Sequence, residues 1–149
     1  MPLFETTINI DHSLVADIVL KNWDIKLGKL IKASQNHTFE AHSQDDKLKY
    51  SVRVTPDPQK EHLQRIKDEI FFVDYLIKTE LKHLVNPIPP VTESDVAPIV
   101  VTGDFIIVVF EWAKGSKLEF MEFRWMKDKA VIFAWGRFFA QLHKQSRKF

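Results

Sequence analysis

The side chains of Arg53 and Glu69 could together form a binding site for a phosphate chain. Arg53 lies in a strand-like run, residues 48–54, in which alternate side chains point to opposite faces. An arginine in the middle of a strand needs an anionic partner, and Glu69 lies at the margin of the apolar face of a predicted helix, from where it can point toward the sheet. An Arg53–Glu69 pair would hold a fixed positive charge of the kind that phosphate requires. The alternative is that both side chains face solvent.

The sequence lacks the residues that several other kinds of site require. The chain has no cysteine, which excludes a disulfide framework, a thiolate metal site and a cysteine nucleophile. Its histidines have no metal-binding spacing, and neither a His-Glu-x-x-His nor a Gly-x-Ser-x-Gly pattern occurs. The sequence therefore indicates neither a metal hydrolase nor a serine hydrolase.

The composition is that of one near-neutral globular domain. The 149 residues include 21 Lys+Arg and 20 Asp+Glu, and 45% of them are hydrophobic, which is enough for one core. A net charge of +1 argues against a nucleic-acid binder that works by bulk charge. No basic patch followed by an apolar stretch opens the chain, and no apolar run reaches the roughly 18 residues of a spanning helix. We expect a cytoplasmic protein without a membrane or nucleic-acid partner.

Charge and aromatic content both change near residue 113. Residues 1–113 carry 12 basic and 17 acidic side chains, whereas residues 114–149 carry 9 basic and 3 acidic ones. Of the 18 aromatic residues, 11 lie in the 45 residues from Phe105 onward. This change, beside the flexible Lys114-Gly115-Ser116, predicts a boundary between residues 1–113 and residues 114–149.

The hydrophobic pattern predicts an α+β fold with a five-stranded antiparallel sheet. A short helix with Ser13 as its N-cap and an end at Asn22 comes first, and a long helix over residues 59–82 covers one side of the sheet. Residues 86–90 form a stiff extended connector. The expected strands, three in a meander and two in a hairpin, are residues 29–33, 38–42, 48–54, 98–101 and 105–112.

Two helices are expected after the sheet, over residues 118–125 and 128–145. The second is strongly apolar, with a stripe of Val131, Trp135, Phe138 and Leu142 and further aromatic residues beside it. A helix of this composition requires burial on more than one face. We therefore expect self-association, or a completing chain that covers it.

Five segments, in this order along the chain, carry a resemblance to a known family. They are Asn36-His37-Thr38-Phe39, Tyr50-Ser51-Val52-Arg53-Val54, Lys67-Asp68-Glu69-Ile70, residues 108–115 and residues 135–143. Together they resemble the N-terminal lobe of the aminoglycoside phosphotransferase and choline kinase family, the small-molecule relatives of protein kinases. The resemblance implies a protein-kinase-like lobe that binds ATP, with a hinge and the first helices of a second lobe behind it.

The resemblance also implies a role for individual residues. Asn36 would lie in the loop over the ATP phosphates, Arg53 would contact the α and β phosphates, and Glu69 would fix Arg53. Adenine would be contacted by the hinge, whose backbone groups leave little side-chain signature. The hinge residues are Phe110, Glu111, Trp112 and Ala113. Without the resemblance, Asn36 is a good turn residue and the hinge is the end of a core strand.

The chain departs from the family in its catalytic part. The family takes its catalytic carboxylate and its magnesium ligands from a His-Gly-Asp segment, a downstream Asn and a further Asp, and these elements have no match here. The loop over residues 34–37 contains no glycine, and an arginine stands where protein kinases use lysine.

We accordingly expect an ATP-binding lobe that is incomplete and inactive as this chain, with Mg²⁺ bound only when a second lobe is present. A fragment, a natural half-domain and a component completed by a partner chain all fit the sequence. The alternative function is a non-catalytic protein-interaction module that retains the fold of the lobe and docks a partner through the basic, aromatic residues 114–149.

Overall fold

The computed structural model describes residues 10–79, 81–91, 97–115 and 124–149. Its helices and strands are arranged as expected for an α+β domain, with runs of consecutive strands between the helices. The elements are α1 (His12–Trp23), β1 (Ile25–Ala33), β2 (His37–Ser43), β3 (Lys49–Pro56), α2 (Leu63–Ile77), β4 (Pro87–Ile88), β5 (Val100–Thr102), β6 (Phe105–Glu111), a 3-10 turn η2 (Arg124–Met126) and α3 (Lys129–Ser146).

The sheet is antiparallel throughout, as predicted, but it has six strands and not five. Its order is β1-β2-β3-β6-β4, with β5 also paired to β6. The extra strand is β4, in the segment for which an extended connector was expected, where Pro87 and Ile88 pair with Phe110 and Val109. Because β5 pairs with residues 105–107 of β6, the two short strands β5 and β4 follow one another along the same outer edge.

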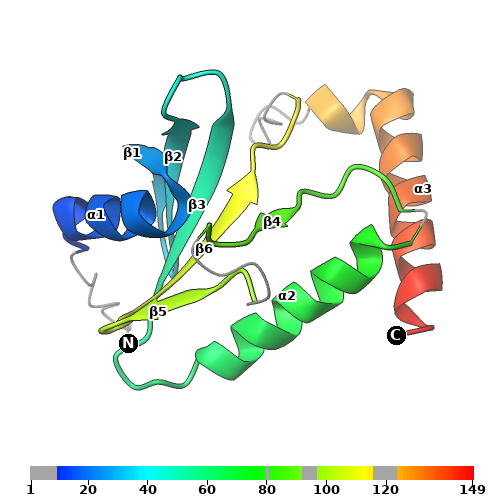
Figure 1. Ribbon diagram of the computed structural model, residues 1–149. Helices are drawn as coiled ribbons and strands as arrows, with labels where there is room; N and C mark the ends of the chain where they lie inside the picture. The colour runs from blue at the N-terminus through cyan, green and yellow to red at the C-terminus, as the bar shows by residue number, and fades with distance from the viewer. Residues whose placement is uncertain (1–9, 80, 92–96, 116–123) are drawn as a thin grey trace, which may run out of the picture.

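Two helices cover opposite faces of this sheet (Figure 1). On one face, Val15, Val19 and Trp23 of α1 pack against alternate residues of the central strands. On the other face, Ile66 and Ile70 of α2 pack against Ile99, Ile106 and Val108. Alternation therefore divides β6 between the two cores, with Ile107 and Val109 on the α1 side and Ile106 and Val108 on the α2 side.

The start of α1 differs from the prediction. Its N-cap is Asp11 and not Ser13, because the Asp11 carboxylate accepts hydrogen bonds from the backbone N–H groups of Ser13 and Leu14, at 2.9 and 3.4 Å. Both residue types favour this position, and periodicity alone does not choose between caps two residues apart. The helix extends one residue further than expected, to Trp23.

The long helix, α2, is shorter than the predicted range of residues 59–82. It begins at Leu63 and ends at Ile77. Asp57 is buried, and one of its carboxylate oxygens accepts hydrogen bonds from the N–H groups of Glu61 and His62, at 2.8 and 3.0 Å. Lys60 has a left-handed backbone, with φ of 60°. Residues 57–62 thus form a capped turn before α2, in place of its first helical turn.

The last helix lies close to its prediction, with Asp128 as the N-cap of α3. It stands beside the C-terminal end of α2 (Figure 1), where the Tyr75 hydroxyl donates to the Gln145 carbonyl at 3.2 Å. Phe149 packs there against the rings of Phe71, Phe72 and Tyr75. The helix expected over residues 118–125 falls mainly outside the described residues.

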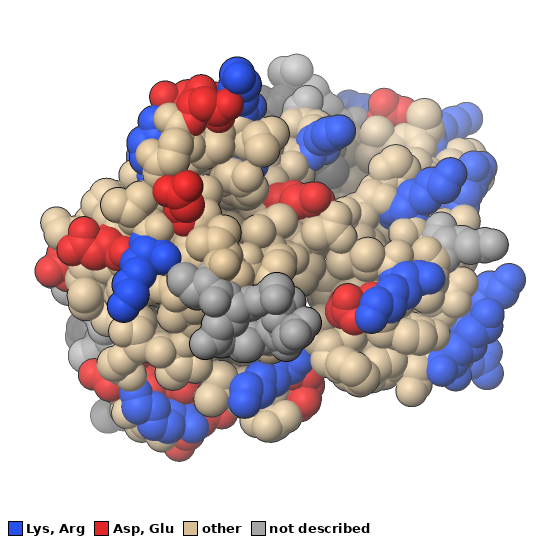
Figure 2. All heavy atoms as spheres, in the orientation of Figure 1, with Lys and Arg blue, Asp and Glu red and all other residues tan. Residues whose placement is uncertain are grey.

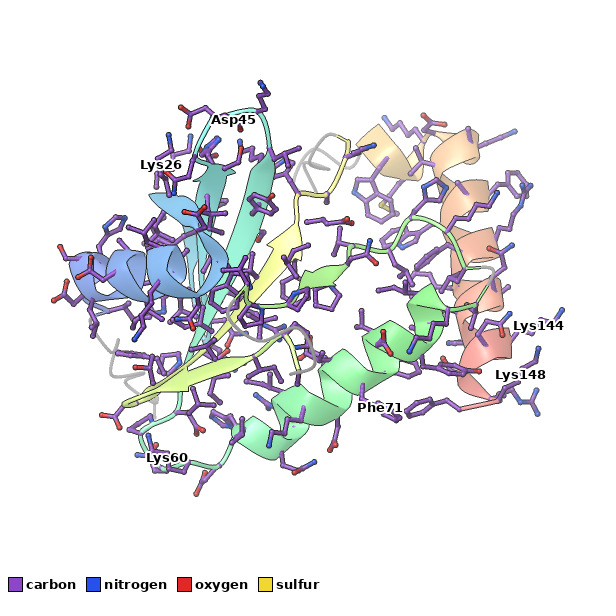
Figure 3. The ribbon with its side chains drawn as sticks, viewed as in Figure 1. Lys26, Asp45, Lys60, Phe71, Lys144 and Lys148 are labelled. Carbon is purple, nitrogen blue, oxygen red and sulfur yellow. The ribbon has the colours of Figure 1, made fainter. Side chains whose placement is uncertain are left out.

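Much of the surface of α3 is apolar or basic. None of its residues is fully buried, and four large apolar side chains are exposed, namely Ile132, Phe133, Trp135 and Phe139. Figure 2 shows Lys and Arg side chains along the α3 side of the molecule, and Figure 3 places Lys144 on this helix and Lys148 just beyond its end. The basic and aromatic side chains of residues 124–149 are thus largely at the surface.

Candidate functional site

The structure brings Arg53 and Glu69 together as a two-point pair. The two terminal nitrogens of the Arg53 guanidinium donate to the two carboxylate oxygens of Glu69, at 2.7 and 3.2 Å. Arg53 projects from β3 on the face that α2 covers, and Glu69 lies between Ile66 and Ile70, the residues through which α2 packs on that face. The Arg53 side chain is 20% exposed and that of Glu69 is 45% exposed, so the pair lies at the boundary between core and solvent.

Arg53 has further capacity for binding. Within the described residues its buried Nε–H has no acceptor. The guanidinium lies over the ring of Phe110, 5.3 Å from the ring centroid. A guanidinium that is oriented by a carboxylate on one side and by an aromatic ring on another loses little conformational freedom when it binds an anion.

Asn36 lies in the turn that joins β1 to β2. Its carbonyl accepts a hydrogen bond from the Ser34 N–H at 3.1 Å, which closes a turn of three residues. Thr38, which lies in β2 two residues after Asn36, is the cross-strand partner of Arg53. The turn therefore lies near Arg53. The glycines with a positive φ, Gly103 and Gly115, are not part of this turn.

The four residues predicted to form the hinge differ in their surroundings. Phe110 is partly buried in the core beneath α2. The Glu111 N–H donates to the Asn86 carbonyl at 2.9 Å, and the Glu111 carboxylate accepts from the Asn86 backbone and amide N–H groups at 3.2 and 2.7 Å. Glu111 thus fastens the segment that leads into β4. Trp112 and Ala113 follow the end of β6 and are exposed.

A second charged cluster, which the sequence reasoning missed, lies on the same face of the sheet. Lys49 Nζ donates to one oxygen of Glu40 at 2.7 Å, and His42 Nε2 contacts the other oxygen at 3.1 Å. These hydrogen bonds, the one from Lys49 foremost, lower the pKa of Glu40 to about 2. Lys49 Nζ also lies 4.0 Å from the centroid of the Trp112 ring. Alternation along β3 could have revealed Lys49, because residues 49, 51 and 53 share one face.

Neither a metal-binding cluster nor a membrane-spanning helix is found in the part of the chain that the structure describes. No group of three or more His, Asp or Glu side chains is placed to hold a metal ion there. Among the described helices, none is long and apolar enough to cross a membrane.

The described residues form an antiparallel sheet with Arg53 on its α2 face, paired to Glu69 of that helix. Comparison with solved structures shows a kinase-like fold. The chain is similar to a structure described as amicoumacin kinase hAmiN in complex with AMP-PNP, Ca²⁺ and Ami, with a TM-score of 0.60 and 15% sequence identity. The likeness covers 73% of this chain but 33% of the kinase, so the chain spans about a third of that protein. No family model and no curated protein matches the sequence.

Proposed function

We propose that this chain is the ATP-binding lobe of a small-molecule phosphotransferase. Arg53 holds the α and β phosphates, Glu69 orients Arg53, the turn at Asn36 covers the phosphates, and the hinge over residues 110–113 contacts adenine. The observation that carries the proposal is the two-point Arg53–Glu69 pair, whose guanidinium retains a buried N–H donor with no acceptor among the described residues. A similar fold in a kinase whose structure contains AMP-PNP supports it.

In this proposal the chain binds nucleotide, and transfer of the γ phosphate to a substrate hydroxyl depends on a second lobe. Phosphoryl transfer requires a carboxylate that positions the acceptor and ligands that hold Mg²⁺ against the phosphates. We therefore assign Mg²⁺ binding and catalysis to residues outside those described here. The boundary between the two lobes falls at residues 113–114, where the composition changes.

The test is calorimetric titration of the full chain with ATP, with and without Mg²⁺. Arg53→Ala should abolish measurable binding, and Arg53→Lys should weaken it about tenfold, because lysine keeps the charge but not the planar fork. Lys78→Ala is the matched control, because Lys78 is an exposed cation at the C-cap of α2 that pairs with Asp74 of that helix. Binding that is equal in all four proteins, or absent from the unaltered chain, would contradict the proposal.

The exposed surface of α3 favours a second candidate, a non-catalytic interaction module. Ile132, Phe133, Trp135 and Phe139 are each more than a third exposed, so a partner or a second copy could bury them. This candidate predicts concentration-dependent association in sedimentation velocity that Phe133→Glu prevents, together with no nucleotide binding. A monomer that binds ATP would contradict it.

A further inference from the structure

The exposed surface of α3 has apolar side chains on both sides of a glycine. Phe133 is 71% exposed, and Ile132 and Phe139, which lie two turns apart, are each nearly half exposed. Gly136 lies between Phe133 and these two residues on the surface of the helix. Among the described residues, a Cβ atom at Gly136 would meet no atom from outside α3 within 4 Å. The backbone of another helix can therefore approach α3 closely at this position.

The charge of the α3 surface disfavours its pairing with a second α3. Residues 124–149 include seven Lys and Arg but a single acidic residue, Asp128, whose carboxylate is occupied as the N-cap. Arg137 lies one turn after Phe133, and Lys144 lies two turns further on the same side of the helix. Neither cation forms an ion pair with a described residue. Two such surfaces would repel each other, whereas an acidic surface would be attracted.

The exposed surface of α1 has the complementary character. Leu14 and Leu20 are each nearly half exposed, and Asp17, which is also exposed, lies midway between them in the helix. Asp17 forms no ion pair with a described residue. Residues 11–24 contain three aspartates and one lysine. The α1 surface therefore combines apolar side chains with an excess of negative charge, as a partner of α3 requires.

The two helices are too far apart to meet within one chain. α1 covers one face of the sheet, and α3 stands beside the C-terminal end of α2, at the opposite side of the molecule (Figure 1). A contact between α1 and α3 must therefore join two copies. Because the two surfaces differ, a copy whose α3 is occupied still presents a free α1. Such a heterologous contact produces an open chain of copies or a closed ring.

We propose that the α1 surface of one copy docks on the α3 surface of a second copy. Leu14 and Leu20 then cover the apolar side chains around Gly136. Asp17 then lies among the cations of α3. Apolar side chains fill the centre of such an interface, and opposite charges set its orientation. The contact involves no residue of the candidate phosphate site, so it is independent of ATP binding.

The experiment measures association of the full chain by sedimentation velocity at several concentrations. The unaltered chain should associate, and Leu14→Lys in α1 or Phe133→Glu in α3 should each weaken association by about tenfold or more. High salt should also weaken it, because opposite charges contribute to the contact. Leu48→Lys is the control, because Leu48 is an exposed leucine that lies in neither helix, and it should associate like the unaltered chain. Far-UV circular dichroism should be the same for all four proteins, since each substituted side chain is exposed.

A mixing experiment distinguishes the α1–α3 contact from symmetric pairing. Leu14→Lys keeps an intact α3 surface, and Phe133→Glu keeps an intact α1 surface. An equimolar mixture should therefore form a dimer at a concentration at which neither variant associates by itself. Gly136→Leu should behave like Phe133→Glu, because its side chain occupies the space of the close approach. Leucine also favours a helix over glycine, so this variant should keep its fold.

Three results would overturn the proposal. Association of Leu14→Lys equal to that of the unaltered chain would indicate that α3 pairs with α3. A mixture that contains no dimer would show that α1 and α3 do not dock on each other. A chain that is monomeric at every concentration would leave the α3 surface to a partner of another kind.

Discussion

The Trp23 indole donates a hydrogen bond of 2.7 Å to the Ile88 carbonyl, which connects the last turn of α1 to β4. Trp23 is 4% exposed, and Ile88 is 65 residues distant in sequence, so this contact closes the core beneath α1 across the width of the sheet. It also ties α1 to β4, which pairs with β6, the strand that leads into the predicted hinge.

Replacement of Trp23 by phenylalanine keeps an aromatic ring and removes the donor. The Ile88 carbonyl then loses its partner in a partly buried position, and we expect the free energy of unfolding to fall by about 2 kcal/mol. Urea denaturation followed by circular dichroism measures the change. Trp112→Phe serves as the comparison and should change stability by less than about 0.5 kcal/mol, because Trp112 lies at the surface. Equal losses in the two variants would contradict the assigned hydrogen bond.

Asp57→Ala should destabilise the turn before α2. The substitution leaves the N–H groups of Glu61 and His62 without their acceptor, and a loss of about 1–2 kcal/mol is expected from the removal of such a cap. Asp57→Asn keeps a carbonyl oxygen at the same place and should retain most of the stability. Thermal denaturation distinguishes the two variants, and identical behaviour would argue against a capping role for Asp57.

Arg53 and Glu69 should be energetically coupled in the absence of any ligand. Because the pair is partly exposed, we expect a coupling free energy of about 0.5–1 kcal/mol from a cycle of Arg53→Met, Glu69→Gln and the double variant. Urea denaturation at low ionic strength is the measurement. The value should decrease in high salt, which screens an exposed pair. Additive effects of the two substitutions would mean that the pair contributes nothing to the fold.

The stability of the chain should depend on Glu40 in acid. The pKa of Glu40 falls from 4.5 to about 2 in the folded protein, so folding favours its ionised form. The resulting stabilisation is fully present above the unfolded-state pKa and is lost as the pH falls toward the folded-state value. The stability gap between the unaltered chain and Glu40→Gln should therefore be narrower at about pH 3 than at about pH 5. A gap independent of pH would exclude this linkage.

Local pattern was sufficient to predict most of the helices and strands, and also the Arg53–Glu69 pair of the candidate site. The alternation around Arg53 and the helical spacing around Glu69 each fix the direction of a side chain, and their meeting requires only that the helix covers that face of the sheet. The meander of β1, β2 and β3 follows from alternation in the same way, and the structure contains it.

Features that depend on distant partners were not predictable. The pairing of Pro87 and Ile88 with β6 depends on the register between segments more than 20 residues apart. The contact of Lys49 with Trp112 requires the register of β3 against β6, which no local signal specifies. The start of α2 was placed too early because Pro58 favours a helix start, whereas Asp57 and the left-handed Lys60 form a turn instead.

The edges of the sheet have a consequence for how copies of this chain behave together. β1 is an edge strand, and its pairing with β2 is interrupted by register shifts on both sides of Leu30. Lys26, Lys29 and Lys32 lie along it, and the opposite edge is divided between two short strands, one of which begins with Pro87. Irregular pairing, lysines and proline all hinder the addition of a foreign strand. The sheet is thus protected against growth into intermolecular β-aggregates, and any association between copies should proceed through the side chains of α3.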